Sequence, residues 1–248
     1  MKHRAIIIGA GRMGSGWGLS PKAHYYVHAK TYRDLKDRVE LLAFVEPDKE
    51  RAKWASEKWG IQSVPDLEKA LKEFKPDIVS VCTPPQNRDF IESLPESVLG
   101  VWCEKPYALK SSPKRHIQVN YCRRFDRFHQ KVKAHMKDVT FSRLVVMAKK
   151  DVHTVCHLTD LARWWNVDKL DYVDTPGEPG AYMLRYKVKD AFWLEQFFPS
   201  GGLAGDDFMK AALENLLDAV DGKAELVSPP AEAIKAEEWA DEILKGMA

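Results

Sequence analysis

The sequence has little cysteine, four residues in 248, and no Cys-x-x-Cys pair. Three of the four lie in apolar runs, and all are far apart: Cys82, Cys103, Cys122 and Cys156. This is not the pattern of a disulfide-stabilised secreted domain, so we expect reduced thiols in a cytoplasmic protein. Residues 1–4 lead directly into a short apolar run, without the hydrophobic region and cleavage site of a signal peptide.

The sequence also lacks long apolar runs and an excess of either charge. Its 38 basic and 36 acidic residues give a net charge of +2, and 45% of the residues are hydrophobic. Nothing in this composition marks a membrane-spanning, fibrous or disordered chain. Nucleic acid is not expected as a partner, because binding by counterion release needs a concentrated basic face. We predict a small-molecule ligand, and the length allows one large domain or two small ones.

Short apolar runs alternate with helical patterns in the first part of the chain. Residues 49–59 form a helical pattern closed by Gly60, and Asp66 caps another over residues 67–74. This alternation predicts βαβ units and an α/β fold with a doubly wound parallel sheet. The apolar runs, taken as its strands, are residues 5–8, 41–45, 61–64, 77–82 and 98–103.

After Pro106 the pattern changes, and a Ser-Ser-Pro stretch at 111–113 predicts a crossover into a second region. We expect a Rossmann domain over residues 1–106. A smaller α+β domain over 107–248 has a mostly antiparallel sheet, and its C-terminal helices can pack back on the first domain. Residues 182–188 and 192–198 predict a hairpin around Lys189 and Asp190. The other predicted elements are strands at 117–121 and 139–148, and helices at 125–136, 153–165, 207–220 and 230–244.

A glycine motif, Gly-Ala-Gly-Arg-Met-Gly over residues 9–14, directly follows the first apolar run. Gly9 permits a tight turn, Gly11 lets the backbone approach a pyrophosphate, and Gly14 lets helix and strand pack closely. We therefore predict a dinucleotide site that includes Arg12 and Met13. The alternative is a tight turn without a ligand; the preceding strand is the context that favours binding.

The chain between this motif and the second strand is unusually long. Gly16, Gly18 and Pro21 predict an inserted loop after Gly14. A helix is expected to resume near residues 28–32.

Two further strand ends carry candidate cofactor residues. Glu46 ends the second apolar run, where a carboxylate accepts hydrogen bonds from an adenosine ribose and repels a 2′-phosphate. Glu46 therefore favours NAD as the cofactor, with NADP as the alternative. The other interpretation of Glu46 is an acidic surface residue at a strand end, without a role in binding. Thr83 and Pro84 follow the run 77–82, at the edge where open α/β sheets bind ligands. Thr83 is expected to line the nicotinamide ribose, or else the segment is a loop held by proline.

The sequence Glu104-Lys105-Pro106 follows the run 98–103 at the same edge. An ammonium group there can hydrogen-bond a substrate hydroxyl and stabilise the alkoxide that forms as hydride leaves carbon. A lone lysine after a strand is ordinarily solvated, so this prediction depends on its context. Glu104 and Pro106 constrain the backbone on both sides of Lys105.

The helix predicted over residues 153–165 carries a polar stripe beside an apolar face. His153, His157, Asp160 and Trp164 share the stripe. His157 has an intrinsic pKa of about 6.5, suited to taking a hydroxyl proton, and Asp160 can orient the helix or ring. One alternative is a metal site of His153, His157 and Asp160, although three ligands on one helix are incomplete; we therefore assign no metal. Another is a hydrogen-bonded histidine at a domain interface.

Together these residues resemble the Gfo/Idh/MocA oxidoreductases, which use NAD(P) to oxidise or reduce sugars, polyols and related compounds. The resemblance covers nearly the whole chain. It rests on the glycine motif after the first strand, Phe44-Val45-Glu46-Pro47-Asp48, Cys82-Thr83-Pro84-Pro85, Cys103-Glu104-Lys105-Pro106, the segment 120–126, and His157-Leu158-Thr159-Asp160-Leu161.

The resemblance implies that Lys105 and His157 lie beside the nicotinamide and substrate as the catalytic pair. It implies cofactor contacts that include Glu104 and a homodimer or homotetramer. The substrate contacts expected are Asn120, Arg124, His153 and Asp160; an arginine suits the phosphate or carboxylate of a nucleotide sugar or sugar acid.

The chain departs from the family pattern in three places. His153 stands where an aspartate is common, Arg88 stands where the Thr-Pro loop often reaches a histidine, and the segment 107–119 is short. These departures keep two rivals open. One is a dinucleotide-binding sensor or scaffold without turnover, and the other is a reductase of a non-sugar substrate such as a tetrapyrrole or an imine.

Overall fold

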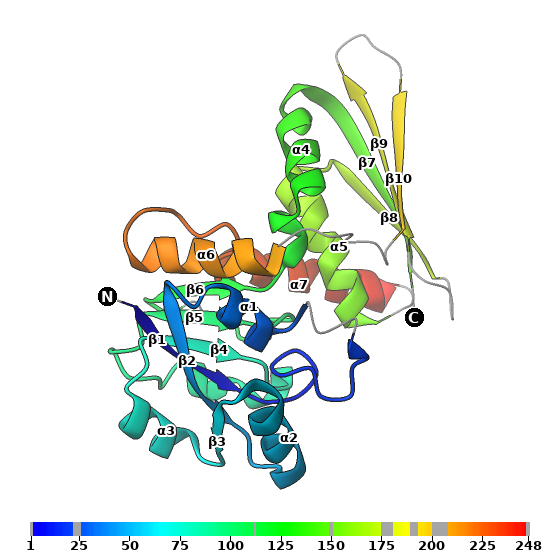
Figure 1. Ribbon diagram of the computed structural model, residues 1–248. Coiled ribbons are helices and arrows are strands. Elements are labelled where there is room, and N and C mark those ends of the chain that lie inside the picture. Colours follow the sequence, from blue (N-terminus) through cyan, green and yellow to red (C-terminus); the bar gives the residue numbers. More distant parts are fainter. Residues whose placement is uncertain are drawn as a thin grey trace. The chain divides into compact units, whose positions relative to one another are not determined.

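A computed structural model describes residues 2–21, 26–111, 113–148, 151–174, 181–188, 193–199 and 208–246 (Figure 1). It divides into two compact units. The first comprises Met1–Asn120 and Met209–Pro230, and the second comprises Tyr121–Phe208 and Ala231–Ala248. The chain therefore enters the second unit, returns to the first, and ends in the second.

This division differs from the boundary expected at Pro106. Strand β6 (His116–Val119), assigned from sequence to the second region, pairs in parallel with β5 (Gly100–Cys103). The first unit consequently extends to Asn120. Sequence pattern alone does not say which sheet a strand joins, because that depends on hydrogen bonds to a distant partner.

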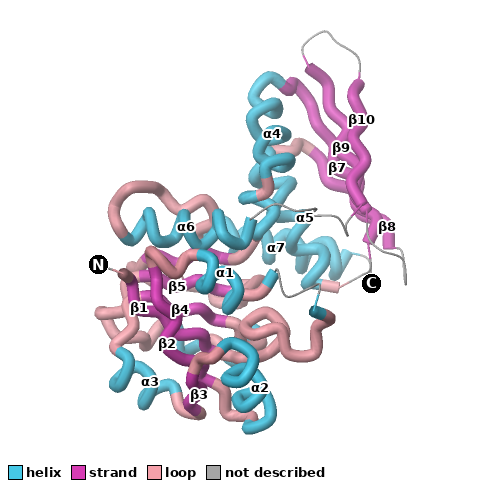
Figure 2. Tube along the Cα trace, viewed as in Figure 1, coloured by secondary structure: helices cyan, strands magenta, loops and turns pink. Residues whose placement is uncertain are grey.

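The first unit contains a six-stranded sheet in the order β3-β2-β1-β4-β5-β6 (Figure 2). Every neighbouring pair is parallel. This is the doubly wound order of a Rossmann fold, so the fold predicted for this part of the chain is confirmed. Its other strands are β1 (His3–Ile8), β2 (Val39–Val45), β3 (Gln62–Val64) and β4 (Ile78–Val81).

Local sequence determines where the helices of this unit begin and end. Asp48 caps α2 (Lys49–Trp59) by accepting a hydrogen bond from the Arg51 backbone, and Gly60 ends it at a φ of 69°. Asp66 likewise caps α3 (Leu67–Phe74). The remaining helices are α1 (His28–Asp34) and α6 (Phe208–Val220), with short 3-10 turns at Pro85–Asn87 and Asp89–Ile91.

Helix α6 packs on the sheet at Gly100. A Cβ there would lie 2.8 Å from the Ile78 side chain, 2.9 Å from Val220 and 3.3 Å from Leu216. Gly100 therefore brings α6 close to β4 and β5. Close packing of α6 on the sheet at Gly100 thus explains why residues 209–230 belong to the first unit.

Two segments separated in sequence by the inserted loop expected after Gly14 join as consecutive turns of one helix. Residues 11–16 form a first turn, in which the Ser15 backbone N–H donates to the Gly11 carbonyl at 3.0 Å. Helix α1 then continues this turn, because the His28 N–H donates to the Met13 carbonyl at 2.9 Å and the Ala29 N–H to that of Gly14 at 3.0 Å. The helix resumes at His28, as predicted.

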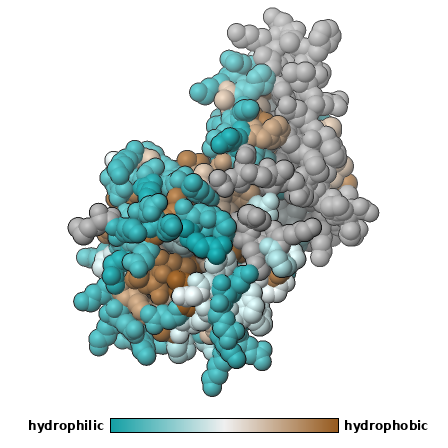
Figure 3. All heavy atoms as spheres, in the orientation of Figure 1, coloured by the Kyte–Doolittle hydropathy of each residue, from teal (hydrophilic) through white to brown (hydrophobic). Residues whose placement is uncertain are grey.

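One face of the first unit carries an apolar hollow. Figure 3 shows it as a brown area, and its volume is about 350 Å³. It lies beside α1, which has only seven residues. Its lining combines apolar side chains from α1, β2 and the end of α2 with a charged rim: Ala29, Tyr32, Val39, Leu41, Trp59 and Ile61, with Lys2, Arg33, Lys36 and Glu40.

The second unit contains a four-stranded sheet in the order β10-β9-β7-β8. The β7–β9 and β9–β10 pairs are antiparallel and the β7–β8 pair is parallel, which confirms a mostly antiparallel sheet and the predicted hairpin. The turn expected at Lys189 and Asp190 lies outside the described residues. The strands are β7 (Val139–Ala148), β8 (Lys169–Asp174), β9 (Ala181–Val188) and β10 (Trp193–Pro199).

Helices of the second unit build its core with β7. They are α4 (Arg127–His135), α5 (Val152–Trp165) and α7 (Pro230–Gly246), with 3-10 turns at Cys122–Phe125 and Met136–Asp138. Leu144 and Val146 of β7 pack against Leu158 and Leu161 of α5, and Trp165 is fully buried among them. Burial of this face fixes which stripe of α5 faces the sheet.

Candidate functional site

Candidate residues follow the carboxyl ends of five neighbouring strands of the first unit. Gly9 follows β1, Glu46 follows β2, Thr83 lies beyond β4, Glu104 follows β5, and Asn120 follows β6. The strands lie side by side in the order β2-β1-β4-β5-β6. The sheet thus brings these sequence-predicted residues to one edge, the edge where open α/β sheets bind ligands.

Packing within the protein explains two of the three motif glycines. Gly9 has a φ of 93°, and a Cβ on it would lie 3.0 Å from the carbonyl carbon of Cys82. A Cβ on Gly14 would lie 2.0 Å from the Gly9 carbonyl oxygen. Neither position accepts a side chain, since the atoms in the way belong to the backbone.

The third glycine has no such explanation within the protein. A Cβ on Gly11 would meet nothing within 4 Å. Arg12 beside it is exposed and Met13 is half-buried. Open space at Gly11 fits the close approach of a pyrophosphate to the backbone, so the turn suits the dinucleotide expected from the sequence.

The Glu46 side chain turns toward this glycine turn and is 5% exposed. Its Oε2 accepts a hydrogen bond from the Ala10 backbone N–H at 2.9 Å, and its Oε1 accepts one from that of Asp48 at 3.0 Å. Arg51 Nη2 lies 3.3 Å from Oε1. Glu46, the residue directly after β2, therefore also holds the glycine turn. Arg51 is a neighbour that the sequence did not predict.

Arg88 joins the loop beyond β4 to the segment around Lys105. Its Nε and Nη2 donate to the Thr83 carbonyl at 3.0 and 2.7 Å. Its Nη1 donates to the carbonyls of Glu104 and Pro106. Arg88 is 2% exposed and Lys105 is half-buried. The sequence predicted that proline holds the loop at Thr83 and Pro84. The structure adds a second constraint, the buried guanidinium of Arg88.

The Glu104 carboxylate lies in a buried hydrogen-bonded cluster behind Lys105. Its Oε1 is 2.9 Å from His28 Nε2 and accepts from Asn120 Nδ2 at 2.6 Å, while His28 Nδ1 lies 3.0 Å from Ser80 Oγ. Burial alone raises the pKa of a carboxyl group, but the hydrogen bond and charge of His28, with help from Asn120 and Lys105, lower the pKa of Glu104. Glu104, the residue directly before Lys105, is therefore ionised.

His28 was not among the candidate residues from sequence. Its available signal was its place as the first residue of the helix expected to resume after the insertion. Helix α1 places His28 against the sheet, where the centroid of its ring lies 3.7 Å from the ring centroid of Trp102 in β5. Such a contact depends on strand order, which local pattern does not reveal.

His157 belongs to the second unit and lies on α5, as expected. Its half-buried ring packs nearly perpendicular to the Tyr121 ring, with centroids 5.8 Å apart. The Tyr121 hydroxyl donates to Glu237 Oε1 of α7 at 2.9 Å. Burial, with repulsion from Cys156 and Glu237, raises the pKa of Tyr121 well above its usual value, so this hydroxyl keeps its proton.

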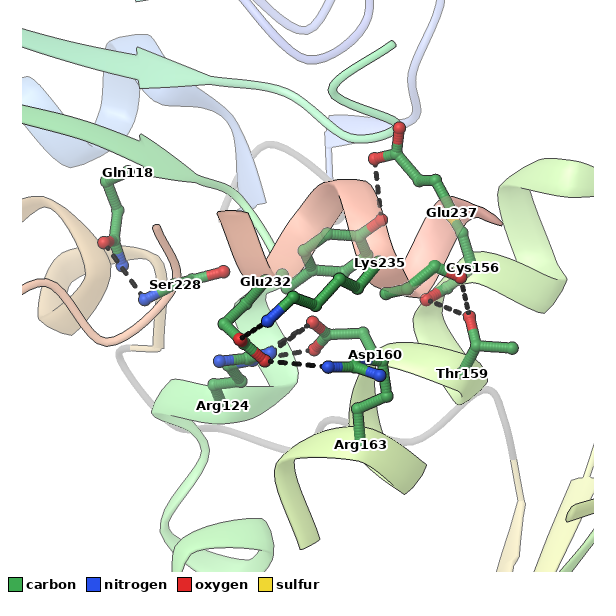
Figure 4. A network of polar contacts seen from close by, with 12 residues as sticks. Gln118, Arg124, Cys156, Thr159, Asp160, Arg163, Ser228, Glu232, Lys235 and Glu237 are labelled. Atoms are coloured by element: carbon green, nitrogen blue, oxygen red, sulfur yellow. Dashed lines mark hydrogen bonds and ion pairs between the residues drawn. The ribbon is translucent and has the colours of Figure 1, made fainter. Parts of the chain in front are cut away.

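Arg124 and Asp160 form a buried ion pair (Figure 4). Arg124 Nη2 donates to Asp160 Oδ1 at 2.7 Å and Nε to Oδ2 at 2.9 Å, with exposures of 2% and 1%. Burial raises the pKa of Asp160 to about 6, with Arg124 opposing the rise and Glu232 and Glu237 adding to it. The pair links the turn after β6 to α5, and its charges face each other.

The metal interpretation receives no support from the parts of the chain that the structure describes. His153 lies in α5, but its side chain is outside the described residues, and the Asp160 carboxylate is held by Arg124. Among the described residues, no three or more His, Cys, Asp or Glu side chains gather as a metal site would require. Within the same residues, no helix combines the length and apolar character needed to cross a membrane.

A family model matches the first half of the chain. The model of an oxidoreductase family with an NAD-binding Rossmann fold, GFO_IDH_MocA, matches residues 3–124. This segment contains the glycine motif, Glu46, Thr83, Lys105 and Asn120. No curated protein sequence matches the chain.

Solved structures share the fold at low sequence identity. The WlbA dehydrogenase from Chromobacterium violaceum, solved with NADH and UDP-GlcNAcA, is 16% identical with a TM-score of 0.70, covering 98% of this chain and 92% of its own. A putative myo-inositol dehydrogenase from Sinorhizobium meliloti 1021 is 14% identical with a TM-score of 0.73, covering 100% and 98%. Myo-inositol 2-dehydrogenase from Lactobacillus plantarum is 16% identical with a TM-score of 0.67, covering 99% and 97%.

Proposed function

Because this chain belongs to the Gfo/Idh/MocA oxidoreductases, whose model its residues 3–124 match, we propose that it is an NAD-dependent dehydrogenase or reductase. Its substrate is a secondary alcohol or ketone of a sugar, polyol or nucleotide sugar, as in the dehydrogenases that share its fold. The observation that carries the proposal is the single strand edge that holds both a glycine turn open at Gly11 and Lys105.

The glycine turn and its neighbours hold the cofactor. Backbone N–H groups around Gly11 bind the pyrophosphate, and Glu46 accepts hydrogen bonds from the adenosine ribose with its remaining lone pairs. Thr83 and Pro84 line the nicotinamide ribose. When bound, the oxidised cofactor NAD would accept the hydride, and NADH would supply it in the reverse direction.

Lys105 and His157 share the proton chemistry. The Lys105 ammonium donates a hydrogen bond to the substrate oxygen and stabilises the negative charge that develops there. His157 takes the hydroxyl proton as the hydride leaves carbon, and returns it in the reverse direction. The two residues come from different units, so their meeting at the substrate is part of the proposal.

The other residues expected to touch substrate act indirectly in this scheme. The Asn120 amide donates to Glu104, and Arg124 and Asp160 bond to each other. We assign Asn120 to supporting the Lys105 segment, and the ion pair to orienting the helix that carries His157. His153, one turn before His157 on α5, remains the candidate for direct substrate contact.

Turnover and cofactor binding of Lys105→Ala test this assignment. With a panel of polyols and nucleotide sugars, kcat should fall by at least ~10²-fold, the scale for a positioned acid-base group, while NADH affinity stays the same. Lys110→Ala, an exposed lysine nearby, is the matched control and should keep its activity. Unchanged turnover in Lys105→Ala would remove this lysine from the mechanism. Tight NADH binding without turnover by the unaltered protein would favour the sensor, and activity only on imines or tetrapyrroles the non-sugar reductase.

We also propose a homodimer or homotetramer in the cytoplasm. The sheet of the second unit buries Leu144 and Val146 beneath α5, whereas Phe141 of β7 and Val173 of β8 are 39% and 49% exposed. Burial of such side chains against a second copy would be favourable. Light scattering of Phe141→Glu against the unaltered protein tests this: a loss of mass supports the interface, and a monomeric unaltered protein refutes it.

A further inference from the structure

Arg88 is a buried cation held by carbonyl groups. It is 2% exposed, yet among the residues that the structure describes no carboxylate lies within ion-pair distance of its guanidinium. Its hydrogen bonds go to three backbone carbonyls instead. Removing a charge from water is costly, so a cation retained here indicates that these particular hydrogen bonds matter.

The three carbonyls are placed so that they fix Lys105. Two belong to Glu104 and Pro106, the residues directly before and after the lysine. The third belongs to Thr83, in the loop expected to line the nicotinamide ribose. With the carbonyl just before Lys105 and the carbonyl of the following residue both anchored to one guanidinium, the Lys105 Cα has little freedom to shift relative to that loop.

Only an arginine can make this set of contacts. Its planar fork offers five N–H donors in fixed directions, whereas a lysine ammonium is a compact point charge and a histidine has at most two donors. The chain carries this arginine where the family that it resembles often has a histidine. The arginine that replaces this histidine thus makes hydrogen bonds to three carbonyls that a histidine could not make together.

We propose that Arg88 is the positioning residue for Lys105: through the carbonyls of Glu104, Pro106 and Thr83 it holds the ammonium at the reacting oxygen and in register with the cofactor loop. This inference rests on the proposed function, in which Lys105 acts on the substrate oxygen. Arg88 itself touches neither substrate nor cofactor, so its loss acts through Lys105.

Kinetics of Arg88→Lys and Arg88→Ala test this role. Both should lose kcat by ~10²-fold, the cost of a misplaced catalytic group, with NADH affinity changed less than about tenfold. Guanidinium added below denaturing concentrations should restore part of the turnover of Arg88→Ala and none of that of Arg88→Lys, whose ammonium occupies the space. Arg115→Ala is the matched control, since Arg115 also donates to three carbonyls, those of Leu94, Pro95 and Val98. It should keep kcat.

A double variant separates action through Lys105 from a general structural effect. If Arg88 acts through Lys105, then Arg88→Ala combined with Lys105→Ala should be no slower than Lys105→Ala alone. If the kcat of the double variant fell by the product of the two single losses, the proposal would be overturned. An unchanged kcat in Arg88→Lys would overturn it as well. Full turnover in Lys105→Ala would instead overturn the assignment of Lys105 in the proposed function.

A second readout does not depend on turnover. Reductive ¹³C-methylation gives Lys105 an NMR signal, assigned by its loss in Lys105→Ala. In Arg88→Lys its chemical shift should move toward that of exposed Lys110. An unchanged signal in a folded Arg88→Lys protein would overturn the positioning role even if no substrate is found.

Discussion

The two units hold their polar candidate residues in different ways. In the first unit, Glu46 accepts hydrogen bonds from backbone N–H groups and Glu104 contacts His28 and Asn120 at the end of a sheet, while Gly11 faces open space. In the second unit, Arg124 and Asp160 are buried and form hydrogen bonds to each other. The first arrangement leaves room for a ligand, whereas the second holds helices together.

This contrast explains why similar side chains carry different roles. A carboxylate that accepts from backbone N–H groups keeps lone pairs for a ligand hydroxyl. A carboxylate paired two-fold with a buried guanidinium offsets the cost of burying that charge, and removing either partner leaves the other charge buried and unpaired. Thus Glu46 stays a candidate for cofactor contact, while for Asp160 we propose only the supporting role of orienting the helix that carries His157.

The largest effect should come from breaking the buried pair of the second unit. Asp160→Ala leaves Arg124 charged and unpaired, and should lower the free energy of unfolding by ~3–5 kcal/mol, measured by urea denaturation. Asp171→Ala, which breaks a more exposed pair with Arg143, should lower the free energy of unfolding far less, because solvent screens this pair. Replacing both members, Arg124→Met with Asp160→Leu, should recover most of the loss. Equal effects of the two single variants would abolish the contrast between the units.

The glycine turn offers a paired test within the first unit. Gly14→Ala should destabilise the protein by ~1–3 kcal/mol, since its Cβ would lie 2.0 Å from the Gly9 carbonyl oxygen. Gly11→Ala should change stability by less than ~0.5 kcal/mol but weaken NADH binding about tenfold, since only a ligand would meet its Cβ. Denaturation and fluorescence titration give the two quantities. NADH affinity that survives Gly11→Ala would argue against a pyrophosphate at this turn.

Asp160 also predicts a pH dependence confined to the second unit. Its pKa is about 6 in the folded protein against 3.8 as a free side chain, so the folded state holds the proton more tightly between these values. Stability contributed by this group is therefore fully present below about pH 4 and falls as pH rises through 6. The loss is at most about 3 kcal/mol, at about 1.4 kcal/mol per pKa unit. Asp160→Asn should remove this slope from unfolding measured between pH 4 and 7, and a slope that persists would assign it to another group.

Cofactor preference gives the smallest expected effect. Glu46→Ala removes a carboxylate that repels a 2′-phosphate and releases Arg51 from its 3.3 Å contact. The NAD over NADP preference in kcat/KM should narrow about tenfold, the scale of one charge-assisted hydrogen bond of ~1.5 kcal/mol. Adding Arg51→Ala should cancel the gain for NADP, and Glu50→Ala, an exposed acid beside it, should leave the ratio alone. A ratio unaffected by Glu46→Ala would mean that another residue reads the ribose.

Much of the first unit is predictable from sequence because its determinants are local. The cap at Asp66, the left-handed Gly60 and the break after Gly14 each set the backbone within a few residues. The assignment of β6 failed for the opposite reason, since its partner β5 is decided by nonlocal pairing. The same limit applied to His28 and Glu104, which are 76 residues apart and meet only once strand order is set.

By itself the sequence determined the glycine turn, the alternation of strands and helices, and the placing of Glu104-Lys105-Pro106 after a buried strand. These follow from backbone geometry and apolar periodicity, which act over a few residues. Only the tertiary structure decided that Arg88 anchors the peptide groups around Lys105, and that Arg124 and Asp160 neutralise each other. Buried polar groups must find partners wherever the fold supplies them, and that supply depends on segments far apart in the chain.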